Sequence, residues 1–219
     1  MAPSRAAPPP PPESGARPAA RVEGRDAILV AAAAAFTERG YTATTIDDIA
    51  DRLGATKGRV YHYYRSKADI FLDIHRYAMQ RMIDMVKPIA EGRAAPAEKI
   101  AAMVRAHAVL LMTSFPFQRV SVQGLERHLA GRVTERQRAA LDGVIRMRDA
   151  YEDLFVRVLE EGRKARAFRS LEPRRAVKPI LGALNWLTVW YRPRPEDGDA
   201  SRTAIAEEMV EFVVRGLRP

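Results

Sequence analysis

The sequence contains no cysteine among its 219 residues. Disulfide bonds, thiolate nucleophiles, cysteine metal sites and cysteine redox sensing are therefore excluded. It also lacks an apolar run of the roughly 20 residues needed to cross a bilayer, since its most apolar stretch, residues 28–36, is short and mostly alanine. Residues 8–12 are all proline, where a signal peptide would be apolar. These absences predict a cytoplasmic protein without a membrane partner.

The sequence shows no arrangement typical of an enzyme. Its four histidines, His62, His75, His107 and His128, have no metal-ligand spacing such as H-x-x-x-H. A nucleophile elbow and a glycine-rich loop that would cradle a phosphate are both missing. We therefore expect no catalytic residue, no metal site and no cofactor.

Basic residues outnumber acidic ones. The chain has 36 Lys and Arg against 27 Asp and Glu, a net charge of +9, and such a balance favours a polyanionic partner. The position of the charge is more informative than its sum. Between Arg52 and Lys67 there are five basic residues and no acidic one. This segment is the first candidate for contact with a polyanion.

The chain divides into three parts. Residues 1–20 are rich in Pro, Ala, Ser and Gly, a composition typical of a disordered tail. Beyond them, apolar residues recur at helical spacing and no alternating strand pattern is found. The sequence therefore predicts an all-α fold, with one helical domain over residues 21–66 and a second over residues 67–219.

Capping residues and prolines predict where the helices begin and end. Gly40 and Gly54 stand in C-terminal cap positions, and Pro88 disfavours continuation of the helix before it. The first four helices are expected over residues 22–39, 45–53, 57–63 and 66–86. Pro96 then opens a fifth helix, which residues 115–117 break. Four more are expected over residues 119–129, 134–164, 173–190 and 199–216.

The helices over residues 45–53 and 57–63 are joined by the short turn Gly54-Ala55-Thr56, as in a helix-turn-helix motif. The start of the second helix would enter the major groove of DNA, where Lys57 and Arg59 can contact guanine and Gly58 permits close approach. Tyrosine hydroxyls can bind phosphates. The alternative is a three-helix bundle with a solvated basic face, in which Tyr61 and Tyr64 pack in the core.

Residues 45–67, TIDDIADRLGATKGRVYHYYRSK, closely resemble the DNA-binding signature of the TetR family, and residues 34–45 are similar to its first helix and turn. The resemblance covers about residues 25–71, with mild departures at Leu53, Ala55 and Thr56. It implies about nine helices and a homodimer on a palindromic double-stranded DNA operator. The predicted DNA contacts are Thr44, Thr45, Thr56, Lys57, Gly58, Arg59, Tyr61, His62, Tyr63 and Lys67.

The resemblance also implies that the last two helices form the dimer interface. An apolar stripe on the final helix would suit this role, although it could equally pack within one subunit. The stripe consists of Ile205, Met209, Phe212, Val213 and Leu217.

Residues 184–193 and 146–152 look like a branch of the family that responds to acyl-CoA thioesters. Such an effector needs an apolar slot for its acyl arm and cations for its phosphates. The predicted ligand contacts are Met103, Met112, Phe115, Phe117, Arg119, Arg146, Arg148 and Trp186. The methionines could instead fill the core and the arginines lie on the surface.

The sequence therefore indicates a ligand-responsive DNA-binding transcriptional regulator, expected to be a repressor released by a small-molecule effector. The alternative within the family is a drug- or hydrophobe-responsive repressor of an efflux gene. Two further functions also fit the sequence, a helical partner-binding protein without DNA affinity and a constitutive DNA-binding protein. Operator binding would distinguish the first of these from a regulator, and effector release would distinguish the second.

Overall fold

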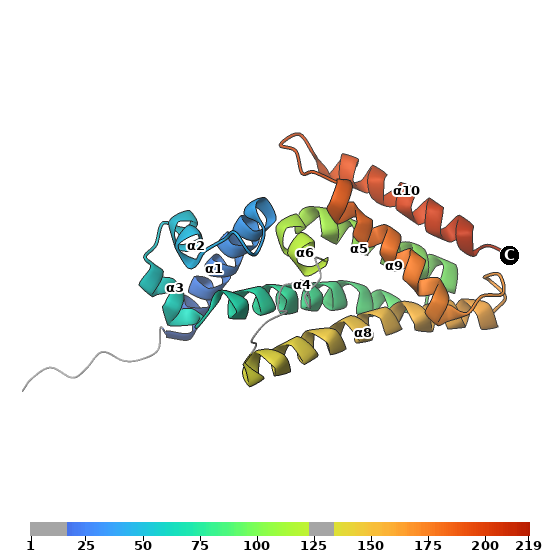
Figure 1. The fold of residues 1–219 in the computed structure, drawn as a ribbon. Coiled ribbons are helices and arrows are strands. Elements are labelled where there is room, and N and C mark those ends of the chain that lie inside the picture. The colour runs from blue at the N-terminus through green and yellow to red at the C-terminus, as the bar shows by residue number, and fades with distance from the viewer. Residues whose placement is uncertain (1–16, 123–133) are drawn as a thin grey trace, which may run out of the picture.

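The computed structural model describes residues 17–122 and 134–219, and every regular element within these ranges is a helix (Figure 1). This confirms the all-α prediction. The helices are α1 (Arg17–Arg39), α2 (Ile46–Leu53), α3 (Lys57–Tyr63), α4 (Lys67–Ala90), α5 (Pro96–Thr113), α6 (Phe115–Val122), α8 (Glu135–Lys164), α9 (Pro173–Trp190) and α10 (Asp199–Leu217).

The first three helices form a small bundle. Thr45 caps α2 through a capping box, in which its hydroxyl accepts from the Asp48 N–H and its own N–H donates to the Asp48 carboxylate at 2.7 Å. Gly54 closes α2 with φ of +63°, a left-handed conformation that favours glycine. Ile49 and Val60 are fully buried and bind α2 and α3 to the bundle. The predicted turn between the two helices is confirmed.

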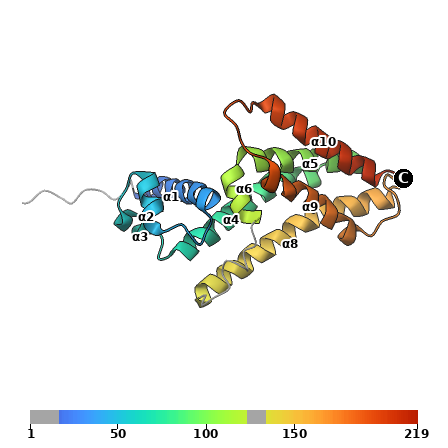
Figure 2. The same ribbon diagram turned by 45° about the horizontal axis from the view of Figure 1, so that its top comes forward.

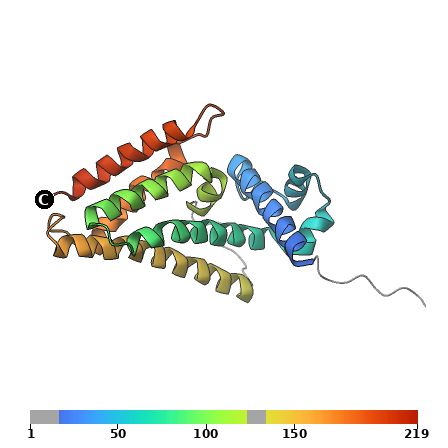
Figure 3. The same ribbon diagram turned by 180° about the vertical axis from the view of Figure 1, so that it is seen from behind.

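Helix α4 belongs to both halves of the molecule. It begins beside α1 and continues into the larger helical unit, where it packs against α5, α6 and α8 (Figures 1 and 3). Ile70, Phe71 and Ile74 of its first half and Met82 and Val86 of its second are buried. A displacement of α4 within the larger unit therefore reaches the small bundle directly.

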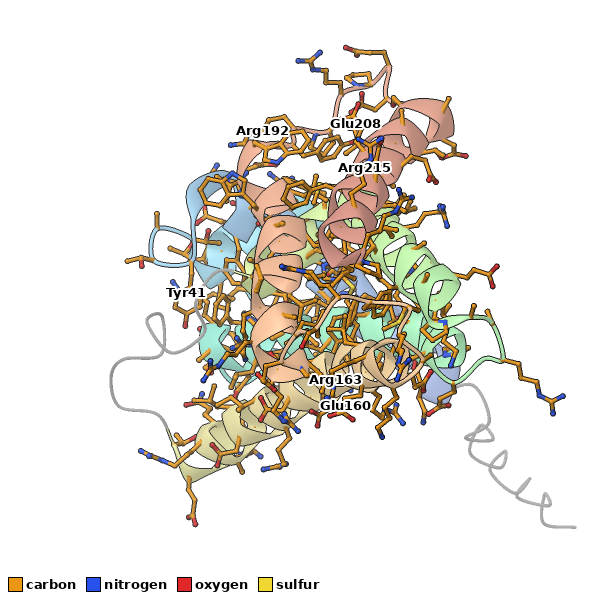
Figure 4. All side chains as sticks on the ribbon, turned by 90° about the vertical axis from the view of Figure 1, so that its right-hand side faces the viewer. Tyr41, Glu160, Arg163, Arg192, Glu208 and Arg215 are labelled. Atoms are coloured by element: carbon orange, nitrogen blue, oxygen red, sulfur yellow. The ribbon has the colours of Figure 1, made fainter. Side chains whose placement is uncertain are left out.

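The larger unit is completed by α8, α9 and α10. Helix α10 packs along α5, and α9 lies between these helices and α8 (Figure 2). A view along the unit shows α8 and α10 on opposite sides, with Glu160 and Arg163 on α8 and Glu208 and Arg215 on α10 (Figure 4). The starts of α8 after Thr134 and of α9 at Pro173 are as predicted.

Three predicted boundaries are wrong. Helix α1 begins at Arg17, since Pro18 is tolerated in a first turn and the two alanines after it favour a helix. Helix α4 continues through Pro88 to Ala90, because a proline in the last turn costs one hydrogen bond while Val86 and Ala90 remain buried.

The third wrong boundary concerns the helix predicted over residues 119–129. Residues 115–117 open α6 instead of only ending α5, because a proline in a first turn has no intrahelical partner to lose. Residues 123–129 of that prediction lie outside the described residues.

In the part of the chain that the structure describes, no single helix is long and apolar enough to cross a membrane. The α5–α6 pair reaches that length and composition only together, across a bend of 106°.

Candidate DNA interface and ligand site

The first turn of α3 is exposed while its centre is anchored. Lys57, Gly58 and Arg59 face solvent, and Val60 is fully buried. A Cβ placed on Gly58 would have only the Thr56 hydroxyl within 4 Å, at 3.8 Å. Packing within the described chain therefore does not require glycine here, and the role of Gly58 in close approach to a duplex stays a prediction. Thr56 itself is exposed, and although threonine is a good N-cap residue, its hydroxyl makes no cap hydrogen bond.

The two cations of this turn differ in their partners. The Lys57 ammonium donates to the Asp47 carboxylate at 2.9 Å, and this hydrogen bond raises the pKa of Lys57. Arg59 makes no ion pair or side-chain hydrogen bond with any residue that the structure describes. Arg59 can therefore bind a base or phosphate without breaking an existing interaction. Lys57 must first break its ion pair with Asp47 or donate to both partners.

The aromatic residues of α3 divide between surface and core. Tyr61 is 47% exposed, so the alternative that it packs in the core is wrong, while Tyr64 is buried as that alternative expected. His62 is exposed and meets the half-buried Tyr63 edge to face at 5.0 Å. Tyr63 lies so close to Gly24 of α1 that a Cβ there would overlap its hydroxyl. Tyr61 and His62 are free to reach a phosphate, and Tyr63 holds α3 to α1.

Two of the residues predicted to contact DNA donate to carbonyls within the protein. Thr44 is fully buried, and its hydroxyl donates to the Gly40 carbonyl at 2.8 Å, so it cannot reach DNA. The Lys67 ammonium donates to the carbonyls of Tyr41 and Thr44 at 2.7 and 2.6 Å and lies over the Tyr41 ring. Both residues secure the turn after α1, and Thr44 is too deeply buried to reach phosphate. Thr45 remains exposed at the start of α2.

The predicted ligand residues are only partly brought together. Met103 is buried in the middle of α5, and Met112 and Phe115 are buried at the junction of α5 and α6. Phe117 is partly buried against Tyr77, with 4.9 Å between the ring centroids. These four apolar predictions therefore share the interior of the larger unit.

The arginines and the tryptophan that were predicted to contact the ligand lie outside this interior. Arg119 packs over the Phe115 ring at 5.8 Å, whereas Arg146 and Arg148 are exposed on α8. Trp186 is 61% exposed on α9, outside the buried apolar set. An apolar stripe in sequence does not reveal which of its members face a neighbouring helix.

Sequence reasoning did not single out a polar pair buried in this interior. The ring Nδ1 of His107 on α5 lies 2.7 Å from the Tyr151 hydroxyl on α8, and both side chains are buried. Burial lowers the pKa of His107 to about 4, against a smaller raising effect of a hydrogen bond to Asn185. His107 is therefore neutral at pH 7. A histidine within an otherwise apolar helical stripe was the available signal.

A second cluster joins the small bundle to α4. Asp73 of α4 accepts from the guanidinium of Arg25 at 2.6 Å, from the Tyr64 hydroxyl at 2.5 Å and from Arg76 at 2.6 Å. Burial alone would raise the pKa of Asp73, but these hydrogen bonds and charges outweigh it and the pKa is lowered. Asp73 thus links α1, the end of α3 and α4 in one network.

Two protein-family models match the chain and together cover most of it. Residues 28–74 match the family described as bacterial regulatory proteins, tetR family, and residues 93–217 match the tetracyclin repressor-like C-terminal domain. The second match alone spans more than half of the sequence.

The chain belongs to the TetR family. It is a DNA-binding transcriptional regulator with a helix-turn-helix, and its family is one of regulators and not of enzymes. The expectation that it is not an enzyme is thereby confirmed. No group of three histidine, aspartate or glutamate side chains that could hold a metal ion occurs among the described residues.

Individual TetR-family relatives are distant but match over most of their lengths. The transcriptional repressor KstR2 of Mycolicibacterium smegmatis is 26% identical, with 92% of each chain covered. The structure of PfmR from Thermus thermophilus is 29% identical with a TM-score of 0.74, covering 88% of this chain and 99% of that one. AibR, solved with isovaleryl coenzyme A and operator DNA, is 24% identical with a TM-score of 0.72, covering 86% and 97%.

Proposed function

We propose that this TetR-family regulator is a cytoplasmic repressor that binds a palindromic operator as a homodimer and leaves it on binding an acyl-CoA thioester. In this proposal residues 21–66 form the DNA-binding domain and residues 67–219 the ligand-binding and dimerisation domain. The observation that carries it is the first turn of α3, where Lys57, Gly58 and Arg59 are exposed above the buried Val60.

The effector class is supported by one relative and one feature of the interior. AibR, whose solved complex contains isovaleryl coenzyme A and operator DNA, shares the fold. The buried side chains of Met103, Met112 and Phe115 supply an apolar environment of the kind that an acyl arm requires. A ligand there would lie beside α4, which continues into the DNA-binding domain.

The homodimer is supported by apolar side chains left on the surface of the last two helices. Trp186, Val189 and Trp190 on α9 and Phe212 on α10 are exposed, Phe212 by 69%. Large apolar side chains that a single chain leaves exposed often mark an interaction surface. A second copy of the chain would cover them by presenting the same face.

Operator binding tests the proposal. DNA flanking the gene for this protein is titrated with wild type, Lys57→Ala and Arg59→Ala, and with Arg138→Ala on exposed α8 as a matched control. Loss of a base contact should cost each α3 variant roughly 1–3 kcal/mol of binding free energy. The control should bind like wild type. If both α3 variants bind as tightly as wild type, α3 is not the reading helix.

The effector is tested by release of the operator in fluorescence anisotropy. A medium- or long-chain acyl-CoA, or an aromatic or steroid-derived CoA, should release the DNA, whereas free coenzyme A should not, because only the acyl arm fills an apolar site. If no thioester acts and an uncharged hydrophobe does, the CoA assignment fails and the drug-responsive alternative holds.

A further inference from the structure

An open groove of about 1130 Å³ lies where the DNA-binding helices meet α8. Helix α8 runs along α4 and its first turns extend toward the small bundle (Figure 1), so the groove has α3 on one side and α8 on the other. Its lining comes from α1, α3, the loop after α3, α4 and the first half of α8. None of the ligand residues predicted from the sequence lines it.

The groove presents positive charge. Four arginines line it, Arg25, Arg65, Arg76 and Arg136, against two aspartates, Asp69 and Asp73. The aspartates are mostly buried and their oxygens are occupied within the protein: Asp73 by Arg25, Tyr64 and Arg76, and Asp69 by Arg136 at 2.9 Å and by Gln137 at 3.2 Å.

The guanidinium groups, in contrast, are exposed and keep N–H donors for a ligand. Arg65 has no side-chain partner among the described residues. The groove is therefore suited to an anion with several charged oxygens, for which the arginine fork is matched.

Apart from Gln137, whose amide donates to Asp69, the rest of the lining is aromatic or apolar. On the α3 side lie the rings of Tyr61, His62 and Tyr63, and on the opposite side lie Val144 and Met147 of α8. Aromatic rings stack on nucleobases without regard to base identity. Arginines for phosphates, rings for a base and apolar side chains beyond them match the 3′-phosphoadenosine diphosphate end of coenzyme A.

We propose that this groove binds the nucleotide end of the acyl-CoA effector, an assignment that rests on the function proposed above. A ligand in the groove touches α3 and α8 together. Bound effector would therefore act on the recognition helix directly, in addition to any movement of α4. The effect on DNA affinity is set by how much better the ligand fits the DNA-free arrangement of the two helices.

A steric variant tests the assignment without removing a charge. Ala140 is an exposed residue of α8 that lines the groove, and the adjacent Ala139 is exposed but does not line it. Ala140→Trp should fill the groove and weaken binding of palmitoyl-CoA about tenfold or more in calorimetry, because the bulk occupies the ligand's volume. Ala139→Trp, the matched control, should stay within about twofold of wild type, and both variants should keep the thermal stability of wild type.

A charge variant tests the same site independently. Arg136→Gln should weaken palmitoyl-CoA binding by about three- to tenfold, with a smaller loss at high salt, because a phosphate contact is electrostatic. Arg138→Gln on the same turn, outside the groove, should have no effect.

The outcomes separate this assignment from the proposed function. If wild type is released from the operator by palmitoyl-CoA and Ala140→Trp binds it equally well, the groove assignment is wrong and the function stands. If wild type binds the operator but no acyl-CoA, both the effector class and the groove assignment fail. Equal losses in Ala140→Trp and Ala139→Trp would also overturn the groove, since the effect would not depend on the lining.

Discussion

Lys67 shows how a cation of the DNA-binding segment can serve the fold. Its ammonium donates to the carbonyls of Tyr41, Thr42 and Thr44, at 2.7, 3.2 and 2.6 Å. Burial lowers the pKa of Lys67, as expected for a charge withdrawn from water. The three carbonyls belong to the loop between α1 and α2. Because a loop carbonyl has no helical N–H to accept from, the Lys67 ammonium supplies the donor instead.

Lys67→Met should therefore destabilise the protein and leave the salt dependence of DNA binding unchanged. Loss of the hydrogen bonds to a partly buried loop should cost roughly 1–3 kcal/mol in urea unfolding. Lys87→Met, on the exposed side of the same helix, should cost little. A flatter dependence of log K on log salt in Lys67→Met, with unchanged stability, would instead make Lys67 a phosphate contact.

His107 should make stability fall in mild acid. Its folded pKa of about 4 lies below its ordinary value of 6.5, so the unfolded chain binds more protons between these values. The free energy of unfolding therefore decreases as the pH falls from about 6.5 toward 4, by about 3 kcal/mol in total, and this loss is absent above that window.

Urea unfolding across this pH range provides the test. His107→Gln should remove this component of the pH dependence, whereas the exposed His62→Gln should retain it. An unchanged profile in His107→Gln would show that another group is responsible.

At the scale of elements, α8 contains two glycines in opposite situations. Gly162 is buried near its end, where the chain turns back through Arg166, which has φ of +56°, and places the Phe168 ring against it. The Ala167 N–H donates to the Gly162 carbonyl at 2.9 Å and closes this turn. Gly143, in the first half of α8, has no atom nearer than 3.9 Å to its Cβ position.

Gly162→Ala should consequently destabilise the protein by roughly 1–3 kcal/mol, because its methyl group overlaps the buried Phe168 ring. Gly143→Ala should stabilise it by about 0.5–1 kcal/mol through helix propensity alone. Thermal unfolding of the two variants decides this. A loss of stability in both would mean that the first half of α8 packs more tightly than the structure shows.

At the scale of the whole molecule, the proposed dimer depends on α9 and α10. Phe212→Glu should give a monomer in light scattering, because a carboxylate would be buried against an apolar partner face. The monomer should bind a full operator poorly, since one half-site supplies only part of the contacts. Glu211→Gln, next to it and exposed, should remain dimeric. A fully dimeric Phe212→Glu protein would remove this residue from the interface.

The sequence by itself determined which segments form helices and where the helix-turn-helix motif lies. Thr45 with Asp48, Gly54 and Thr134 with Gln137 cap helices through groups at most a few residues apart, so their hydrogen bonds follow from local order. The same holds for the exposed Lys57 and Arg59, whose position in the first turn of α3 depends only on where that helix begins. The resemblance of residues 45–67 to the TetR family rests on this same short segment.

Only the tertiary structure decided which polar and aromatic side chains remain accessible. Lys67 meets carbonyls 23 to 26 positions earlier, and His107 meets Tyr151 44 positions later. The groove between α3 and α8 likewise combines residues from both halves of the chain. Burial depends on partners brought together by packing, and spacing along one helix does not specify which neighbour covers which face. Trp186, apolar in sequence and exposed in the fold, is the clearest case.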